Sequence, residues 1–353
     1  MKIKLSVSGL FVASVAVIIL IGILAFYQLF SSSPTVDSRK ATLNYTFTGH
    51  KSIVTSVRFS NNDSFLITGS VDSTIKIWER NTGRLVMQMK QPQGISYLDV
   101  SSDGKYIATG SYDSMVRIWD VDNGKQLKVL MGHKGTIWTV SFSPDGKMLA
   151  SSGDDAVIKI WDVCSGKLLR ELKGHQRIVW SVKFSNDGTQ LASGSFDYTM
   201  KLWNTKDGSL IWDNKEHNEA VVDLAFSHNG TLLATTSDDK TIRVWDMNTR
   251  RLVRMFEVPE HVQAVAFSPD DRYLLTGGRD KPLIGEFLQN IFGDSYYNKG
   301  VSARLWDVQT GELLQTFSHH ANDVMDVTWS HDGERFATAS ADGTVDLWKI
   351  SKR

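Results

Sequence analysis

Residues 132–162 read GHKGTIWTVSFSPDGKMLASSGDDAVIKIWD, and this stretch contains the repeated unit of the chain. Its segment TIWTVSFS alternates apolar and polar residues, a pattern typical of a strand with one buried face. The residues SPDG follow, and Asp145-Gly146 favours a tight hairpin turn. MLASSG and VIKIWDV predict two further strands, and LLRELKG beyond the next turn predicts a fourth. The unit therefore predicts four strands joined by short turns.

The same unit recurs along the chain with a period close to 42 residues. Seven of the eleven tryptophans stand at equivalent positions, separated by 41, 42, 42, 42, 61 and 42 residues. In five units a His precedes an Asp by 22 residues, and in six units that Asp precedes the Trp by six. The seven tryptophans are Trp78, Trp119, Trp161, Trp203, Trp245, Trp306 and Trp348. A regular period near 40 residues indicates a repeat architecture.

The recurring dipeptides resemble the signature of the WD-repeat β-propeller family. Gly132-His133 and Gly174-His175 supply its first part, and Trp119-Asp120 and Trp161-Asp162 supply its second. The resemblance covers about residues 41–350. It implies an all-β fold, a seven-bladed WD-repeat propeller with four strands per blade around a channel.

The two ends of the repeat region indicate how the ring closes. We expect residues 41–353 to form one propeller, because the seven repeats occupy nearly all of this region. Residues 41–48 resemble the last strand of a unit, and the seventh unit ends at Ile350 without a last strand of its own. We therefore expect residues 41–48 to be the closing strand of blade seven, which would leave no open ring end.

The resemblance also implies that recurring His, Ser, Asp and Trp residues form a structural hydrogen-bonded relay. Four repeats contain all four types: His50, Ser70, Asp72 and Trp78; His175, Ser195, Asp197 and Trp203; His217, Ser237, Asp239 and Trp245; and His320, Ser340, Asp342 and Trp348. A single Ser, His and Asp set could be a nucleophilic triad. A set that recurs four times, each time with Trp, indicates a structural role instead.

Three repeats depart from this pattern. Gln91 replaces the His of repeat two, and Gly153 replaces the Ser of repeat three. Repeat six has Val258 in the His position and Gly278 in the Ser position. We therefore expect blades two and six to be tied least firmly.

Composition and spacing exclude several kinds of site. The 39 Lys and Arg residues balance 39 Asp and Glu residues, so no basic field favours a nucleic-acid partner. The single Cys cannot form an internal disulfide, and no CxxC pair is present to bind zinc. The column histidines belong to different blades and cannot converge on one metal ion. The sequence predicts no catalytic residue, cofactor, metal or nucleic acid.

Candidate binding residues lie on one face of the expected ring. In the resembled family, partners usually dock on the top face, which carries the loops entering each first strand and the second-to-third strand turns. The candidates in blades two to four are Tyr112, Trp138, Ile178, Trp180 and Phe196. Exposed Trp and Tyr residues dominate interface energetics, which favours partner binding. The alternative is that these rings pack on one another and line the channel.

Repeat six carries an insertion of 20 residues, 281–300, with the sequence KPLIGEFLQNIFGDSYYNKG. Its apolar residues, including Phe287 and Ile291, recur at helical spacing, and Pro282 and Gly293 suit the two ends of a helix. This helix could bind a partner through Phe287 and Ile291, touch a membrane surface, or only cap its own blade.

The amino terminus predicts a membrane anchor. Residues 5–30 contain no charged side chain and exceed the roughly 20 residues that span a bilayer. The alternatives are a cleaved signal peptide and a buried soluble helix. Lys2 and Lys4 favour a cytoplasmic location for residues 1–4, which would place the propeller on the non-cytoplasmic side. Residues 31–40 read as a polar linker.

These features together predict a non-catalytic, single-pass, membrane-anchored scaffold that binds protein partners through the top face of the propeller. The alternative is a sensor or enzyme that acts on a small ligand at the channel mouth. That alternative needs polar groups that converge, and the sequence offers only scattered candidates such as Asp238, Arg279 and Asp323.

Overall fold

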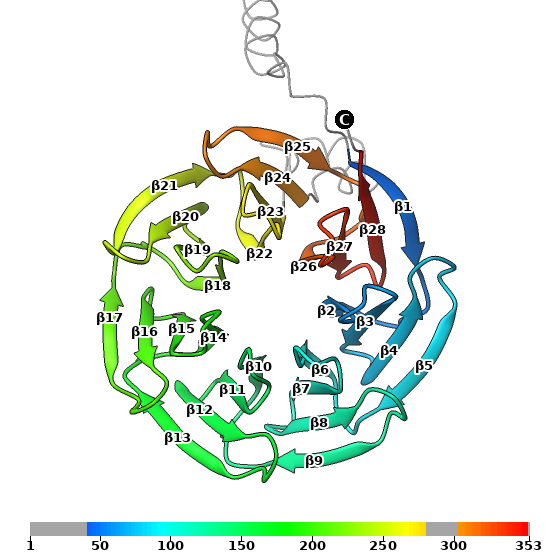
Figure 1. The fold of residues 1–353 in the computed structure, drawn as a ribbon, viewed down its shortest axis with the longest axis horizontal. Coiled ribbons are helices and arrows are strands. Elements are labelled where there is room, and N and C mark those ends of the chain that lie inside the picture. Colours follow the sequence, from blue (N-terminus) through cyan, green and yellow to red (C-terminus); the bar gives the residue numbers. More distant parts are fainter. Residues whose placement is uncertain (1–40, 280–302, 352–353) are drawn as a thin grey trace, which may run out of the picture. The chain divides into compact units, whose positions relative to one another are not determined.

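The computed structural model describes residues 41–279 and 303–351 of the chain. These residues form 28 strands in seven antiparallel sheets of four strands each. The sheets stand side by side as the blades of a closed ring, and one strand of each blade lines the central opening (Figure 1). The all-β, seven-bladed propeller that the sequence predicts is confirmed.

Each blade is listed from its innermost strand to its outermost strand. Blades one and two contain β2 (Val54–Phe59), β3 (Phe65–Ser70), β4 (Thr74–Glu79) and β5 (Leu85–Lys90), then β6 (Ile95–Val100), β7 (Tyr106–Ser111), β8 (Val116–Asp120) and β9 (Gln126–Leu130). Blades three and four contain β10 (Ile137–Phe142), β11 (Met148–Gly153), β12 (Val157–Asp162) and β13 (Leu168–Lys173), then β14 (Val179–Phe184), β15 (Gln190–Ser195), β16 (Met200–Asn204) and β17 (Leu210–Asn214).

The remaining three blades follow the same order. Blades five and six contain β18 (Val221–Phe226), β19 (Leu232–Ser237), β20 (Thr241–Asp246) and β21 (Arg251–Glu257), then β22 (Val262–Phe267), β23 (Tyr273–Gly278), β24 (Ala303–Asp307) and β25 (Leu313–Phe317). Blade seven contains β26 (Val324–Trp329), β27 (Arg335–Ser340), β28 (Val345–Ile350) and β1 (Ala41–Phe47).

The core lies between neighbouring blades. Ile158 of blade three packs with Val179, Leu191 and Trp203 of blade four in one cluster of buried side chains. Burying a large apolar side chain contributes roughly 1.5–3 kcal/mol. Because each such cluster joins two blades, no blade can bury its apolar faces alone, and the ring is stable only as a whole.

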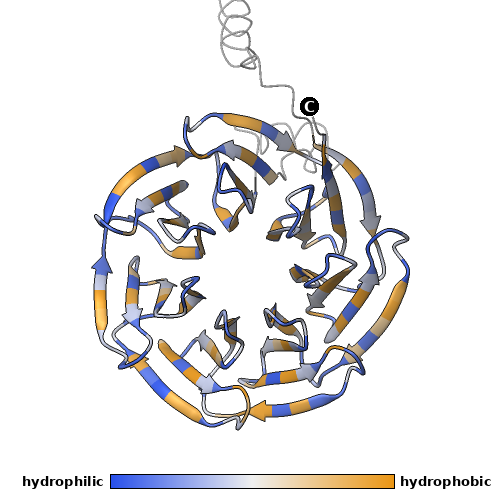
Figure 2. Ribbon diagram, viewed as in Figure 1, coloured by the Kyte–Doolittle hydropathy of each residue, from blue (hydrophilic) through white to orange (hydrophobic). Residues whose placement is uncertain are grey.

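The outermost strands have one exposed face. These strands contain both polar and apolar residues (Figure 2), and apolar side chains such as Leu168 and Leu169 are about half exposed, at 43% and 44%. In the strands nearer the channel, nearly every residue is buried, as in β15. The difference follows from position, because only the outermost strand lacks a neighbouring blade on one side.

The β1–β28 pair closes the ring. The two strands pair antiparallel, from Ala41 opposite Ile350 to Phe47 opposite Val345. The Thr46 hydroxyl also donates to Asp346 at 2.7 Å. The segment that the sequence places as the closing strand of blade seven therefore occupies that position, and the strand ends at Phe47.

The turn between the first two strands of each blade requires a backbone with positive φ. Gly146 occupies this position in blade three with φ +67°, whereas Asp63 and Asp271 occupy it in blades one and six at φ +55° and +57°. Each Asp contacts the preceding blade of the ring: Asp63 accepts the His331 N–H of blade seven at 3.0 Å, and Asp271 accepts the His228 N–H of blade five at 2.6 Å. These bonds offset the strain of a non-glycine residue there.

Several predicted segments lie outside the described residues: the terminal segment 1–4, the membrane helix 5–30, the linker 31–40 and the insertion 281–300 with Phe287 and Ile291. Across the parts that the structure describes, no helix has the length and apolar character needed to cross a membrane.

Candidate functional site

The relay is complete in blade four and ties the loop before β14 to the second and third strands. Asp197 accepts from His175 Nδ1 at 2.9 Å, and the Ser193 hydroxyl lies 2.7 Å from His175 Nε2. The same Ser193 oxygen accepts from Trp203 Nε1 at 2.8 Å. A neutral imidazole satisfies every bond in this chain, since Nδ1 donates and Nε2 accepts.

The hydroxyl of the relay is not the one that the sequence indicates. Ser193 joins His to Trp in blade four, whereas Ser195 accepts the Asp197 N–H at 3.0 Å and donates to the Arg177 carbonyl. Ser70, Ser237 and Ser340 make the same two kinds of bond in their blades. Residues two apart in a strand share a face, so the hydroxyls of Ser193 and Ser195 point the same way. Their roles differ because they lie at different positions along the strand.

This correction brings a fifth blade into the set. The complete relays are those of His50, Thr68, Asp72 and Trp78; His133, Ser151, Asp155 and Trp161; His175, Ser193, Asp197 and Trp203; His217, Thr235, Asp239 and Trp245; and His320, Thr338, Asp342 and Trp348. Blade three is complete although Gly153 fills its Ser column.

Blades two and six differ from each other. In blade two, Gln91 takes the place of the His and accepts from Thr109, which accepts from Trp119. Asp113 there forms an ion pair with Arg117 at 2.6 Å. Blade two therefore has more relay bonds than the sequence suggests, whereas the described residues of blade six show only the bond from Trp306 to Thr276.

The electrostatics of the relay suit a structural role. Burial acts to raise the pKa of Asp72, but bonds from the Thr74 hydroxyl, the Lys51 N–H and the His50 ring outweigh it and hold the pKa at about 2. Burial also lowers the pKa of His50. The carboxylate is therefore ionised and the ring neutral at pH 7, and His50, Asp72, Thr68 and Trp78 each have a hydrogen-bond partner in this relay.

A β-bulge builds the mouth of the channel. The innermost strand of every blade skips one residue in its pairing with the second strand. The skipped residues are Thr55, Ser96, Trp138, Trp180, Val222, Gln263 and Met325, and all seven line one hollow of about 70 Å³. A bulge leaves its residue unpaired and re-aims the side chain, which explains why these positions gather at the mouth.

The second-to-third strand turns complete this face, which we call the top face. In each blade the first turn residue donates its N–H to a carbonyl of the loop that enters the first strand, so the two segments are joined. These turn residues are Val71, Tyr112, Asp154, Phe196, Asp238, Arg279 and Ala341. They place the turns of all seven blades on the same side of the ring as the bulge residues.

Four aromatic candidates form one continuous row on the top face. Trp138 and Trp180 stack with ring centroids 4.2 Å apart and an interplanar angle of 17°. Tyr112 contacts Trp138 at 5.9 Å, and Phe196 contacts Trp180 at 5.2 Å. Ile178 lies beside the row, and its carbonyl accepts the Phe196 N–H. The rings do pack on one another, yet Tyr112 remains 39% exposed and both tryptophans are only half-buried.

Trp138 is held in a fixed orientation. Its indole Nε1 donates to Asp154 at 2.6 Å, and the other oxygen of that carboxylate accepts the Thr136 N–H at 2.8 Å. A pre-oriented aromatic surface loses little side-chain entropy on binding, which is an advantage at a protein interface.

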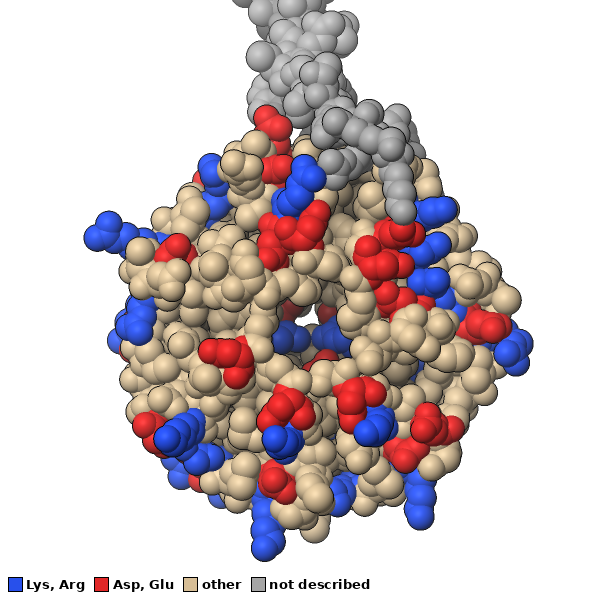
Figure 3. Space-filling model, viewed as in Figure 1, with Lys and Arg blue, Asp and Glu red and all other residues tan. Residues whose placement is uncertain are grey.

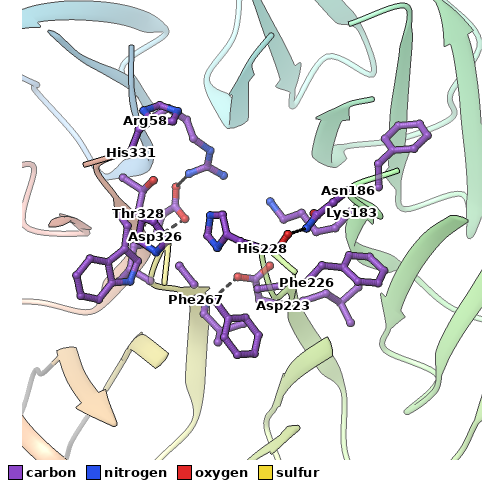
Figure 4. Close-up of a pocket in the computed structure, with 18 of the residues that line it drawn as sticks. Arg58, Lys183, Asn186, Asp223, Phe226, His228, Phe267, Asp326, Thr328 and His331 are labelled. Carbon is purple, nitrogen blue, oxygen red and sulfur yellow. Dashed lines mark hydrogen bonds and ion pairs between the residues drawn. The ribbon is translucent and has the colours of Figure 1, made fainter. Parts of the chain in front are cut away.

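A second polar set lies deeper in the channel, and sequence reasoning missed it. Arg58 donates to Asp326 at 2.6 Å and contacts Tyr97, and Lys183 donates to Tyr97 at 2.9 Å. These side chains and Asp223 line a cavity of about 330 Å³ (Figure 4). Charged side chains are also seen around and inside the central opening in Figure 3. An alignment of the repeats could have revealed this set. Arg58 and Lys183 occupy the same position of blades one and four, and blades five and six have Ala225 and Ala266 at that position.

Burial and charge act together in this set. Burial raises the pKa of Asp326 although Arg58 opposes the shift, and burial likewise raises the pKa of Tyr97. Burial acts to lower the pKa of Lys183, but electrostatic interactions with Tyr97, Asp223 and Asp99 raise the pKa overall. The described residues contain no group of three or more His, Cys, Asp or Glu side chains that could hold a metal ion.

Comparison with known proteins identifies the family. The WD40 family (WD domain, G-beta repeat) matches residues 41–79, 83–120, 124–162, 166–204, 208–246, 251–281 and 311–349. These segments make up well over half of the chain, so the chain belongs to this family.

Several curated proteins are similar over part of the chain. Serine-threonine kinase receptor-associated protein of Gallus gallus is 27% identical over 103 residues, which are 29% of this chain and 24% of that protein. Protein HIRA of Xenopus laevis is 34% identical over 91 residues, 26% of this chain and 9% of its own length. Periodic tryptophan protein 2 of Saccharomyces cerevisiae is 31% identical over 142 residues, 31% and 15% of the two chains. The chain spans at most about a quarter of these relatives.

Proposed function

We propose that this protein is a non-catalytic scaffold that binds a protein partner through the top face of its propeller. The observation that carries the proposal is the continuous row Tyr112, Trp138, Trp180 and Phe196 at the channel mouth. Aromatic side chains at a partly exposed site are the usual anchors of protein interfaces. WD40 propellers generally bind protein partners, which agrees with this role.

The test is Trp180→Ala in the full-length chain, followed by quantitative recovery of bound proteins from the native cell. We expect recovery of the specific partner to fall more than tenfold, because a central aromatic anchor typically contributes at least about 2 kcal/mol. The matched control is Leu169→Ala, which removes a half-exposed apolar side chain from the outermost strand β13. Equal recovery with Trp180→Ala and the wild-type chain, both folded, would exclude the aromatic row as the docking site.

A membrane location is the second part of the proposal. The uncharged run of residues 5–30 supports a single-pass anchor, with residues 1–4 in the cytoplasm and the propeller on the other side. Alkaline carbonate extraction should leave the full-length chain in the membrane fraction. Because we place the propeller on the non-cytoplasmic side, protease added to intact cells or to right-side-out vesicles should degrade the propeller. Release of the chain from the membrane fraction by carbonate would exclude the anchor. Protection of the propeller from protease in right-side-out vesicles would show that the chain has the opposite orientation.

The alternative function is the binding of a small ligand in the channel. The observation in its favour is the cavity of about 330 Å³ lined by Arg58, Lys183 and Asp223, a size within the usual range for ligand sites. Native mass spectrometry of the full-length chain would detect a retained ligand, and Lys183→Met should release it. A spectrum that shows no mass beyond that of the chain would exclude the ligand-binding function, and the scaffold function would then remain.

A further inference from the structure

Two equivalent carboxylates of the top face have different surroundings. Asp154 of blade three and Asp238 of blade five occupy the same turn position. Asp154 accepts from Trp138 Nε1 and from the Thr136 N–H. In blade five the corresponding residues are Val222, which has no donor in its side chain, and Ala220, whose N–H makes no bond to Asp238. Within residues 41–279 and 303–351 the Asp238 carboxylate has no hydrogen bond or ion pair.

The surroundings of Asp238 favour a positive charge. Burial raises the pKa of its carboxyl; the nearby His261 opposes this shift, and the like charges of Glu219 and Asp239 add to it. A half-buried carboxylate without a donor is costly, and an added cation would remove that cost.

No neighbouring basic side chain pairs with Asp238: His261 lowers the pKa of its carboxyl but makes no hydrogen bond or ion pair with it among the described residues. Arg279 already pairs with Asp323 at 3.3 Å, and Lys240 pairs with Glu260 at 3.6 Å. The cation that would satisfy Asp238 is therefore to be sought outside the described part of the chain.

The aromatic row ends in blade four, the neighbour of the blade that carries this carboxylate. Phe196 occupies in blade four the turn position that Asp238 occupies in blade five, and Trp180 occupies the bulge position next to that of Val222. Blades four and five are neighbours in the ring (Figure 1). Aromatic faces attract ammonium and guanidinium groups, so a cation that reaches Asp238 can also contact these rings.

A second unsatisfied polar group lies in the adjoining hollow. Thr139 is only 2% exposed, and its hydroxyl has no hydrogen-bond partner among the described residues. It lines the hollow whose rim includes Trp138, Trp180 and Val222. Both the Thr139 hydroxyl and the Asp238 carboxylate can accept a hydrogen bond from an N–H donor of a bound segment.

We propose that the top face recognises a basic protein segment, with a Lys or Arg side chain paired to Asp238 and an adjacent apolar part on the aromatic row. This inference rests on the proposed scaffold function and specifies the chemistry of its partner. Charge-assisted bonds to a carboxylate are stronger than neutral ones, and guanidinium can make two of them at once. Asp238 thereby supplies selectivity, while Trp180 and its neighbours supply contact area.

The test selects random peptides displayed on phage with the full-length chain as bait, in parallel with three variants. Asp238→Asn removes the charge and keeps the shape. Asp122→Asn makes the same change at an exposed turn between the third and fourth strands, and Trp180→Ala removes the central ring. We expect Lys and Arg to be enriched in peptides selected by the wild-type chain and by Asp122→Asn. That enrichment should disappear with Asp238→Asn.

A binding measurement follows with the most enriched peptide, synthesised with its basic residue or with Gln in its place. We expect the Gln peptide to bind the wild-type chain about tenfold more weakly, and both peptides to bind Asp238→Asn with equal affinity. Failure to enrich any basic peptide on the wild-type chain, or equal enrichment on Asp238→Asn, would overturn the inference.

The same variants separate this inference from the proposed function. If peptides are lost with Trp180→Ala but bind Asp238→Asn as they bind the wild-type chain, the aromatic docking site stands and the basic partner is excluded. If Trp180→Ala has no effect on any selected peptide, the proposed docking site itself fails.

Discussion

Blades four and six have the same four strands but are held together by different means. In blade four, His175 links its entry loop to Asp197, Ser193 and Trp203 through hydrogen bonds. In blade six the equivalent residue is Val258, which packs in a cluster with Val262 and Trp306. His175 and Val258 are equally buried, each 6% exposed.

The difference teaches that the relay is one of two solutions to the same packing problem. An apolar side chain can fill the position without loss, because no polar group is then left without a partner. A polar side chain requires the whole chain of bonds, since an incomplete buried network is worse than an apolar one. Single substitutions in the relay of blade four should therefore lower the stability more than the replacement of the relay His by Val258 in blade six suggests.

The largest effect is expected from Ser193→Ala in blade four. This change leaves both His175 Nε2 and Trp203 Nε1 without a partner, at roughly 1–3 kcal/mol for each buried group. We expect the free energy of unfolding in urea to fall by about 2–4 kcal/mol. A loss below about 0.5 kcal/mol, the usual range for surface changes, would show that the bonds contribute little.

Asp197→Ala should have the next largest effect. It removes the acceptor of His175 Nδ1 and of the Gln176 N–H, both of which lie 2.9 Å from the carboxylate. Because water can reach part of this turn, we expect a smaller loss of about 1–3 kcal/mol in the same urea experiment. Asp122→Ala, in an exposed turn, is the matched control and should stay near the wild-type value.

Thr276→Val in blade six should cost less than either change. Among the described residues, Trp306 Nε1 is then the one group that loses its acceptor, and valine preserves the shape of threonine. We expect a loss of about 1 kcal/mol, measured as a shift of the urea midpoint at constant slope. A loss equal to that of Ser193→Ala would mean that the His bond in blade four adds nothing.

The smallest effect concerns the dependence of stability on pH. Hydrogen bonds from His175 and Thr199 lower the pKa of Asp197 in spite of its burial, so the unfolded chain binds more protons below about pH 4. Stability from this group is therefore present above about pH 4 and is lost as the pH falls through the folded-state pKa. Asp197→Ala should lose less stability than the wild-type chain between about pH 5 and pH 3.

Blade six supplies the control for the pH experiment. Thr276→Val changes no ionisable group, so its curve of unfolding free energy against pH should run parallel to that of the wild-type chain. If Asp197→Ala also runs parallel, the carboxylate is not stabilised by the relay and the bonds do not set its ionisation.

Much of the fold follows from the sequence because the period is regular. The His, Asp and Trp columns, the four strands of each unit and the closing strand β1 all follow from spacing and alternation. The relay hydroxyl does not, since Ser193 and Ser195 are the same residue type on the same face of β15. Only the distance from His175 and Trp203 distinguishes them, and that distance is a tertiary quantity.

The candidate site shows the same division. The sequence by itself determined a WD40 ring and aromatic residues in blades two to four, because a repeat aligns equivalent positions. Only the tertiary structure decided that a bulge turns Trp138 and Trp180 into the channel mouth, where they stack. It likewise decided that Asp154 has donors while Asp238 has none within the described residues. Contacts between blades depend on side-chain directions that no single repeat encodes.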